Sequence, residues 1–313
     1  MIVDLPNTTT NAINSRIVGM RNSGGAIALG RVLTLVVVTG EQEIDDAITV
    51  ANGASHEHPC RVLALAIGNR RGSSRLDAQI RVGGDAGASE VIVLRTYGPL
   101  ASHGDSLIVP LLLPDAPTVV WWPRQAPESP SEDPIGRMAQ RRITDSSFAK
   151  NPVRAIQAQA ATSRPGDTDL AWSRLTRWRA LLAAALDQPP YEPVTRARVS
   201  GAPDSPSTEL LAGWLAMALD CPVTRKRTPA GSGIEGVTLV RESGNVTLDR
   251  PDGTVATLSQ PGQPERRIAM PRRADVDCLT EELRRLDPDE LFGDVLSKGL
   301  ARLRPAKRTG ASP

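Results

Sequence analysis

The sequence predicts an α/β protein: an N-terminal doubly wound, mostly parallel sheet domain, followed by a smaller α+β domain with an antiparallel meander. Three observations carry this prediction. In the first half of the chain, apolar runs rich in Val, Leu and Ile alternate with stretches of helical spacing. Residues 236–272 instead alternate apolar and polar residues between glycine-containing turns, as antiparallel strands do. The length of 313 residues also exceeds the roughly 250–300 at which a single core stops growing.

The first elements alternate helix and strand. We expect, in order, a helix over 7–25, a buried strand over 31–40, a helix over 41–58 and a buried strand over 59–69. Ile13, Ile17 and Met20 fall on one face of the first helix, which makes it amphipathic. Because a strand, a helix and a strand in this order form a right-handed parallel unit, the two buried strands are expected to run parallel.

The rest of the first domain continues in the same way. We expect strands over 76–82 and 90–98, a short helix and a strand within 106–123, a short helix over 134–140 and a strand over 141–147. Apolar and polar residues alternate in 76–82, which is typical of a half-exposed strand at a sheet edge.

The expected domain ranges are 1–150 for a Rossmann-like α/β domain, 151–166 for a connecting helix and linker, 167–303 for the α+β domain and 304–313 for a disordered tail. Residues 167–190 have the clearest helical pattern. Asp167 or Thr168 can cap this helix, and Pro189-Pro190 end it. Its apolar face is formed by Trp172, Leu175, Trp178, Leu182 and Leu186.

The second domain mixes element types. After the helix we expect a strand over 191–201, a helix over 207–223, the meander, and two helices over 275–286 and 289–303. The turns of the meander are expected at Ser243-Gly244, Asp252-Gly253 and Pro261-Gly262.

Composition excludes several classes of function. The formal net charge is only +2, from 37 basic and 35 acidic residues, whereas a nucleic-acid or membrane-surface binder needs a strong basic field. Basic clusters at 224–228, 265–267 and 271–273 flank the meander, and we interpret them as solvated strand ends. No stretch approaches about 18 uninterrupted apolar residues, and the N-terminus lacks the pattern of a signal peptide. We therefore expect no nucleic-acid or membrane partner.

The three cysteines point to a reducing compartment. Cys60, Cys221 and Cys278 are far apart in the sequence, and their number is odd. Such spacing is typical neither of a disulfide framework nor of a metal-binding pair. We therefore expect a cytoplasmic protein.

The glycine-rich stretch RVGGDAGAS (81–89) is the first candidate for chemistry. A dinucleotide fingerprint needs G-x-G-x-x-G after a strand and opening into a helix, whose N-terminus binds the pyrophosphate. Gly83, Gly84 and Gly87 have a different spacing, and the next segment is predicted as a strand. We therefore interpret the stretch as a turn between strands.

No other pattern predicts catalysis. His56 and His58 could form half of a metal site, but no Cys/His cluster completes four ligands, and a solvated helix end is the simpler interpretation. The sequence has no G-x-S-x-G nucleophile elbow. We predict no catalytic residue, no cofactor and no metal.

Trp121 and Trp122 are the best candidates for a binding site. Because they are adjacent on a strand, they point to opposite faces of the sheet. One can enter the core, while the other would lie near the carboxyl end of the strand, where open α/β sheets place ligands. Arg124, Arg95 and Tyr97 are expected at the same edge, where an Arg-lined crevice beside an aromatic suits an anion or an acidic partner loop. Alternatively, both Trp side chains pack under helices and the arginines are solvated.

Several long blocks of sequence carry a family resemblance. They include GRVLTLVVVT, LDAQIRVGGDAGASEVIVLRTYGPLASH, VPLLLPDAPTVVWWP and DLAWSRLTRWRALLAAALDQPP. With these blocks the chain resembles the glucose-6-phosphate dehydrogenase assembly protein family, OpcA, in its high-GC bacterial form, most densely over 1–190. The resemblance implies a non-catalytic accessory protein that associates with this enzyme of the oxidative pentose phosphate pathway and supports its assembly and activity. It also implies a cytoplasmic location and no cofactor.

Two hypotheses follow. In the first, the chain binds glucose-6-phosphate dehydrogenase and stabilises its active oligomer, acting as an allosteric activator. Trp121, Trp122 and Arg124 are then the candidate anchors, because Trp and Arg dominate interface energies. In the second, the Arg-lined crevice binds a sugar phosphate or nucleotide, as a small-molecule module or an enzyme.

Overall fold

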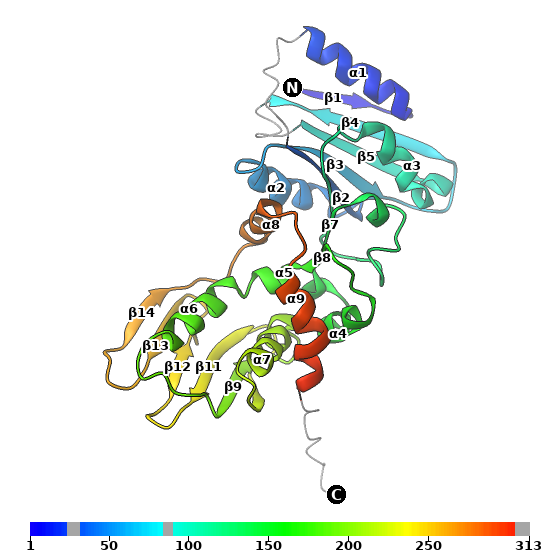
Figure 1. Cartoon of the computed structure of the whole chain (residues 1–313). Helices are drawn as coiled ribbons and strands as arrows, with labels where there is room; N and C mark the ends of the chain where they lie inside the picture. Colours follow the sequence, from blue (N-terminus) through cyan, green and yellow to red (C-terminus); the bar gives the residue numbers. More distant parts are fainter. Residues whose placement is uncertain (24–31, 84–89, 304–313) are drawn as a thin grey trace, which may run out of the picture. The chain divides into compact units, whose positions relative to one another are not determined.

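Figure 1 shows the computed structural model of the chain, which describes residues 1–23, 32–83 and 90–303. The chain forms two compact units. The first consists of Met1–Phe148, Arg164–Leu170 and Ala274–Pro288, and the second of Ala149–Ser163, Ala171–Arg273 and the residues from Asp289 onward. Each unit takes in segments that are far apart in the sequence. The contiguous domain ranges stay a prediction about independent folding.

The first unit is built on a mixed sheet whose order, among the described strands, is β1-β4-β5-β3-β2-β6-β7-β8. The bounds are β1 Ile2–Leu5, β2 Leu33–Gly40, β3 Cys60–Ile67, β4 Arg75–Arg81, β5 Glu90–Tyr97, β6 Thr118–Trp122, β7 Arg141–Thr144 and β8 Asp167–Asp169. From β5 to β8 the strands run parallel, while β4 and β1 pair antiparallel at one edge. The predicted mostly parallel sheet is confirmed.

Helices cover both faces of this sheet (Figure 1). On one face, α2 (Ile44–Ser55) and α8 (Asp275–Arg284) pack together over the central strands. On the other, α1 (Thr10–Ser23), α3 (Gly104–Ile108) and the 3-10 helix η3 (Val109–Leu111) contribute to a second apolar cluster. The remaining 3-10 turns are η2 Gly98–Ser102, η4 Gly136–Met138 and η5 Ser146–Phe148.

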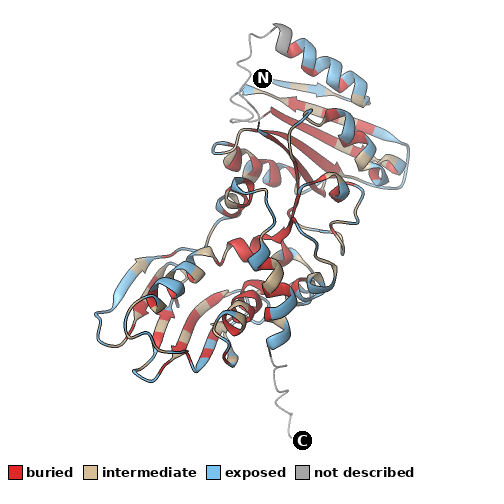
Figure 2. Ribbon diagram, in the orientation of Figure 1, coloured by how far each residue is buried: buried red, intermediate tan, exposed pale blue. Residues whose placement is uncertain are grey.

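The central strands are buried on both sides, as their continuous apolar runs predict. Figure 2 shows the buried residues concentrated along these strands. Along β2, Leu35 and Val37 belong to the cluster beneath α2, whereas Val36 and Val38 belong to the opposite cluster. This alternation follows from the two-residue period of a strand.

Strand β1 was not predicted, and the prediction that β4 forms a sheet edge is wrong. The four residues of β1 pair antiparallel with β4, so β4 lies inside the sheet and is not its edge strand. The alternation in β4 has another cause, because one of its faces is buried while the other is only half covered. A four-residue strand is too short to produce a clear periodic signal.

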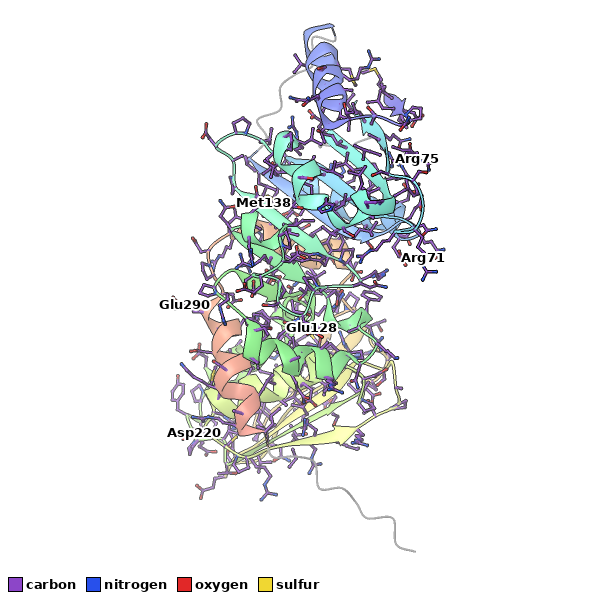
Figure 3. The ribbon with its side chains drawn as sticks, turned by 90° about the vertical axis from the view of Figure 1, so that its right-hand side faces the viewer. Arg71, Arg75, Glu128, Met138, Asp220 and Glu290 are labelled. Carbon is purple, nitrogen blue, oxygen red and sulfur yellow. The ribbon has the colours of Figure 1, made fainter. Side chains whose placement is uncertain are left out.

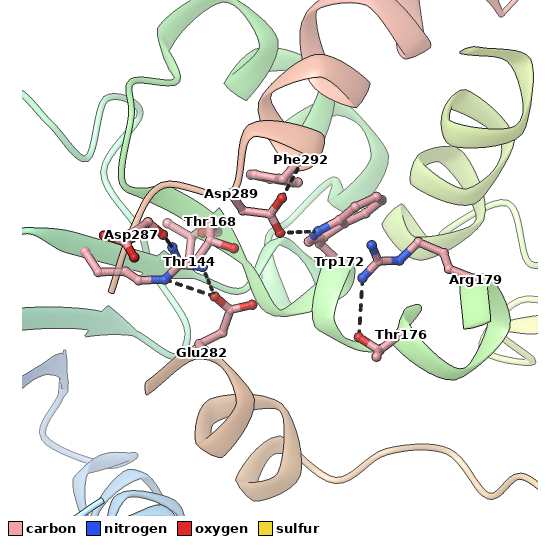
Figure 4. Close-up of polar contacts among 10 residues, drawn as sticks. Thr144, Thr168, Trp172, Thr176, Arg179, Glu282, Asp287, Asp289 and Phe292 are labelled. Atoms are coloured by element: carbon pink, nitrogen blue, oxygen red, sulfur yellow. Dashed lines mark hydrogen bonds and ion pairs between the residues drawn. The ribbon is translucent and has the colours of Figure 1, made fainter. Parts of the chain in front are cut away.

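Two buried ion pairs attach distant segments to the end of the sheet. Arg141 of β7 pairs with Glu282 of α8 and also donates to the carbonyl oxygen of Asp287 at 2.7 Å (Figure 4). Arg142 pairs with Asp167 of β8. All four charged side chains are less than one tenth exposed. These contacts hold segments 164–170 and 274–288 in the first unit.

The second unit contains a separate sheet, in the order β10-β9-β11-β12-β13-β14 among the described strands. The bounds are β9 Arg196–Gly201, β10 Val223–Arg227, β11 Ile234–Val240, β12 Val246–Asp249, β13 Val255–Ser259 and β14 Arg266–Ala269. Only β9 and β10 pair in parallel. Gly244, Gly253 and Gly262 have positive φ values of 126°, 73° and 73°, which suit the predicted turns. The predicted meander is confirmed.

The helices of the second unit pack around one apolar cluster. Their bounds are α4 Pro152–Thr162, α5 Leu170–Ser173, α6 Thr176–Leu186, α7 Pro206–Ala218, α9 Glu290–Asp294, the π-helix η6 Val295–Gly299 and the 3-10 helix η7 Leu300–Arg302. Trp172 packs on Phe292 with 5.8 Å between ring centroids, and its Nε1 donates to Asp289 at 2.8 Å (Figure 4).

Residues 167–190 do not form the single helix that we predicted. Asp167–Asp169 is strand β8, and α5 and α6 follow as separate helices. The carboxylate of Asp167 is bound by Arg142, and the hydroxyl of Thr168 has no hydrogen-bond partner among the described residues, so neither caps a helix as we predicted. The predicted apolar face is nevertheless buried at Trp172, Leu175, Trp178 and Leu182.

Most of the GGDAG stretch and the tail after residue 303 lie outside the described residues. The strands flanking the stretch pair antiparallel, with Arg81 opposite Val91. A strand and not a helix therefore follows it, as predicted. In the part of the chain that the structure describes, no helix has the length and apolar character needed to span a membrane.

Candidate interaction surface

Six parallel strands of the first unit, β5, β3, β2, β6, β7 and β8, end at one edge of its sheet. The chain order reverses between β2 and β6, because β3 and β5 lie on one side of β2 while β6 and β7 lie on the other. In open α/β sheets, ligands bind outside the carboxyl ends of the strands at this reversal. The side chains that follow β2, β5, β6 and β7 therefore form the candidate site.

Carboxylates of the chain itself occupy the reversal point. A Cβ built on Gly40 would lie 2.5 Å from Oε2 of Glu43, so this carboxylate folds back over the end of β2. Asp45 and Asp46 add two more acidic groups in the first turn of α2. The N-terminus of a helix ordinarily attracts anions, but here an incoming phosphate would meet the carboxylates of Glu43 and Asp46. The third acidic group, Asp45, pairs with Arg81 at 2.9 Å. This arrangement disfavours a sugar phosphate or nucleotide at the predicted crevice.

Trp121 and Trp122 lie on opposite faces of the sheet, as predicted, but both are in the core. Their side chains are 1% and 2% exposed, and they belong to the two opposite apolar clusters. Nε1 of Trp121 has no hydrogen-bond partner among the described residues, and the ring borders a cavity of about 30 Å³ beside Arg124 and Glu43. A partner would reach either ring only through the residues that cover it, so their role as contacts stays a prediction.

Arg124 stacks on an aromatic side chain that the sequence analysis did not single out. Its guanidinium carbon lies 3.6 Å from the ring centroid of Phe148, and its Nη1 donates to the carbonyl oxygen of Pro123 at 3.2 Å. Phe148 is 46% exposed, which is unusual for a large apolar residue. No sequence signal links residues 24 positions apart, because only the end of the sheet brings them together.

Tyr97, at the end of β5, connects this strand to the start of β4 and to the residue that follows β2. Its hydroxyl donates to the carboxylate of Glu41, and the guanidinium of Arg75 lies 4.3 Å from the centroid of its ring. The hydrogen bond to Glu41, with smaller contributions from burial and from the charge of Glu41, raises the pKa of Tyr97 above 10.0. Figure 3 shows Arg75 and the exposed Arg71 at the rim of this unit.

The five predicted site residues do not form one crevice. Arg95 is half-buried on β5, in register with Asp77 of β4. Because β5 and β6 are separated by β3 and β2, Arg95 and Tyr97 are about three strand spacings, or ~14 Å, from the strand that precedes Arg124. The edge is therefore a broad surface with an Arg124–Phe148 pair at one place and a Tyr97–Glu41 pair at another.

The acidic residue at the end of the sheet has a structural role. The buried carboxylate of Asp169 accepts hydrogen bonds from the Thr144 hydroxyl at 2.7 Å, the Ser146 N–H at 2.9 Å and the Ser146 hydroxyl at 3.0 Å. These hydrogen bonds connect β8 to the turn after β7, so Asp169 holds this turn in place. Among the described residues, no three His, Cys, Asp or Glu side chains are grouped as a metal site would require.

Two family models match most of the chain. Both describe the glucose-6-phosphate dehydrogenase subunit: residues 51–161 match its N-terminal domain, and residues 165–296 match its C-terminal domain. A relative from Synechocystis sp., named putative OxPP cycle protein OpcA, is 34% identical over 104 residues. That match covers 32% of this chain and only 22% of the relative.

One solved structure resembles this chain over most of the length of both proteins, but at low sequence identity. It is KijD10, a 3-ketoreductase from Actinomadura kijaniata in complex with NADP, with a TM-score of 0.44 and 8% identity. The match covers 87% of this chain and 96% of the reductase, but at this TM-score it carries no argument about function. The two family models, in contrast, follow one another along the chain, which belongs to the OpcA family of glucose-6-phosphate dehydrogenase subunits.

Proposed function

We propose that this protein is a non-catalytic subunit that binds glucose-6-phosphate dehydrogenase and stabilises its active oligomer in the oxidative pentose phosphate pathway. The observation that carries the proposal is the pair of family models over 51–161 and 165–296. The name of the Synechocystis relative, an OxPP cycle protein, supports the same pathway.

The chemistry of the sheet edge agrees with this role. The position that holds phosphates in nucleotide-binding sheets is bordered by the carboxylates of Glu43 and Asp46. The buried carboxylate of Asp169 accepts hydrogen bonds from Thr144 and Ser146 and has a structural role. In a second hypothesis, the edge binds a sugar phosphate or nucleotide. The carboxylates at this position disfavour it, because they would repel the negatively charged phosphate.

The mechanism that we propose is linkage. An accessory protein that binds the active oligomer better than the inactive one shifts the population by its differential affinity. A difference of about 1.4 kcal/mol is sufficient for a tenfold shift. No group of the accessory protein has to enter the active site of the enzyme for this effect.

We further propose that the Arg124–Phe148 pair is an anchor of the interface. Aromatic side chains and Arg are enriched among residues that dominate binding energy. Phe148 is half exposed and its ring is already stacked by Arg124, so little side-chain freedom is lost on binding. Tyr97 and Arg95 are proposed as peripheral contacts at the same edge.

The test is a reconstitution with purified glucose-6-phosphate dehydrogenase from the same organism. We expect the two proteins to co-elute in size-exclusion chromatography, with raised dehydrogenase activity or a larger oligomer. The proposal is refuted if the two proteins do not co-elute and the activity of the dehydrogenase does not change.

A thermal-shift measurement of the isolated protein distinguishes the second hypothesis. Glucose 6-phosphate, 6-phosphogluconate, NADP and ATP are added at millimolar concentration, since a ligand that binds only the native state raises the melting temperature. We expect no shift. A shift that the Glu43→Gln variant enlarges would instead indicate an anion site at the reversal point.

A further inference from the structure

Strand β10 (Val223–Arg227) forms an open edge of the second unit's sheet. β9 lies on one side of it, and no other described strand lies on the other. The carbonyl oxygen of Pro222 accepts from Ala197, and the N–H of Thr228 donates to Gly201, so these two residues face β9. Because backbone groups alternate sides along a strand, those of the odd-numbered residues between them point away from β9. The outward set consists of Val223, Arg225 and Arg227.

A groove runs along the whole of this edge strand. Its volume is about 720 Å³, and its lining includes Pro222 at one end of β10 and Arg227 at the other. Thr208 and Ala216, near the two ends of α7, line the opposite wall. A five-residue strand is about 16 Å long, so the groove has the length of an extended peptide segment of similar size.

The charges along the groove favour an acidic occupant. β10 carries three consecutive basic residues, Arg225, Lys226 and Arg227. Arg225 pairs with Glu209 of α7, whereas Arg227 is exposed and has no ion pair among the described residues. At the other end, Asp220, labelled in Figure 3, pairs with Arg302 at 2.5 Å.

The same charges disfavour a second copy of this chain. Two β10 strands paired edge to edge would place their basic triplets against each other. Charged residues on an edge strand are a common device against self-association. An acidic segment would meet no such repulsion, and strand addition gives it backbone hydrogen bonds as well as charge pairing.

We propose that β10 is a docking edge for an acidic, extended segment of a partner protein. The segment pairs with the outward backbone groups of Val223, Arg225 and Arg227 and places carboxylates beside Lys226 and Arg227. This site is in the second unit and is separate from the surface of the first unit described above. It does not depend on the dehydrogenase being the partner.

The test measures binding of a fluorescent eight-residue peptide of alternating Glu and Thr to the full chain by anisotropy. A peptide with Lys in place of Glu is the matched probe. We expect the acidic peptide to bind and the basic one not to bind. Residue-level hydrogen exchange should show slower exchange at the amides of Val223, Arg225 and Arg227 when the acidic peptide is present.

Two variants separate backbone pairing from charge. Arg227→Pro removes one outward N–H, at a position where an edge strand tolerates proline, and should weaken binding about three- to tenfold more than Arg227→Ala. Lys226→Glu with Arg227→Glu should weaken it more than about tenfold. Arg266→Glu with Arg267→Glu is the control, because it is an equal double reversal on exposed residues of β14 at the opposite edge of the same sheet. It should change affinity by less than about threefold.

Several results would overturn the proposal. The acidic peptide does not bind, or it binds the Arg227→Pro and the doubly reversed variants as tightly as the unmodified chain. Alternatively, citrate displaces the peptide and the amides of β10 are not protected, in which case the groove holds small anions. Melting curves of each variant establish that it is folded. Because the probe is a peptide, these outcomes leave the proposed function unaffected.

Discussion

Tyr97 illustrates how one side chain connects three strands at the edge of the first unit. Its ring is stacked by Arg75 at the start of β4, and its hydroxyl donates to Glu41 after β2. Ionisation of the phenol would place a second negative charge beside Glu41, which is why the pKa is raised.

The raised pKa of Tyr97 predicts a loss of stability in alkali. Above the ordinary value of 10.0 and up to the raised pKa, the folded chain keeps a proton that the unfolded chain has lost. The free energy of unfolding therefore falls as the pH rises through this range. The difference between the absorbance titrations of the unmodified chain and Tyr97→Phe should show this phenol ionising above pH 10. Glu41→Gln should lower the midpoint, and an unchanged midpoint would show that Glu41 is not the cause.

At the exposed aromatic pair, we predict a loss of binding without a loss of stability. Phe148→Ala should weaken binding to glucose-6-phosphate dehydrogenase about tenfold and change the free energy of unfolding by less than about 1 kcal/mol. Tyr191, which is 79% exposed in the second unit, provides a matched control as Tyr191→Ala. Equal affinities for the two variants, measured by titration calorimetry, would remove Phe148 from the interface.

At the scale of elements, α2 and α8 approach each other at a glycine. A Cβ on Gly53 of α2 would lie 2.5 Å from Cγ2 of Val276 of α8. Glycine inside a helix ordinarily costs about 0.5–1 kcal/mol relative to alanine. Its presence here is explained by the close contact, because α8 is held against α2 although about 220 positions separate them in the sequence.

The contact predicts that the effect of Gly53→Ala on stability changes sign when Val276 of α8 is shortened to alanine. Gly53→Ala alone should destabilise the protein by about 1–2 kcal/mol, because overpacking outweighs the gain in helix propensity. In a Val276→Ala background, the same change should stabilise it by about 0.5–1 kcal/mol. Denaturant melts of the four proteins in this cycle measure the coupling. Additive effects would contradict the packing between α2 and α8.

At the scale of the whole molecule, the first unit depends on segments from beyond residue 150. β7 presents Arg141 and Arg142 to Glu282 and Asp167, and all four are buried. Without these segments Arg141 and Arg142 lose their carboxylate partners, and the apolar core that Leu279 and Leu283 of α8 help to form is exposed to water.

A fragment ending at residue 150 should therefore not fold stably. We expect it to lack a cooperative thermal transition in circular dichroism. In the full chain, Glu282→Ala should cost about 3–5 kcal/mol, because it leaves Arg141 uncompensated. Arg285→Ala, an exposed change on the next turn of the chain, is the control and should cost less than about 0.5 kcal/mol. A cooperative melt of the fragment would support the contiguous domain ranges.

The long elements could be predicted from the sequence, whereas several of the short ones could not. β2 and β3 were evident because each is an apolar run buried on both faces. β1, β8 and β10 have four, three and five residues, too few for a period to be recognised. In the candidate site, the opposite orientation of Trp121 and Trp122 followed from strand geometry. Their complete burial and the stacking of Phe148 on Arg124 depended on neighbours from other segments.

The sequence by itself determined the fold class, the meander with its glycine turns and the family, because these depend on local periodicity and on long ordered blocks. Only the tertiary structure decided that carboxylates cover the reversal point, that segment 274–288 completes the first unit, and that Arg225 and Arg227 of β10 line an open groove. The physical reason is that burial, ion pairing and edge exposure are properties of residues brought together from distant positions. A periodic pattern within one segment carries no information about them.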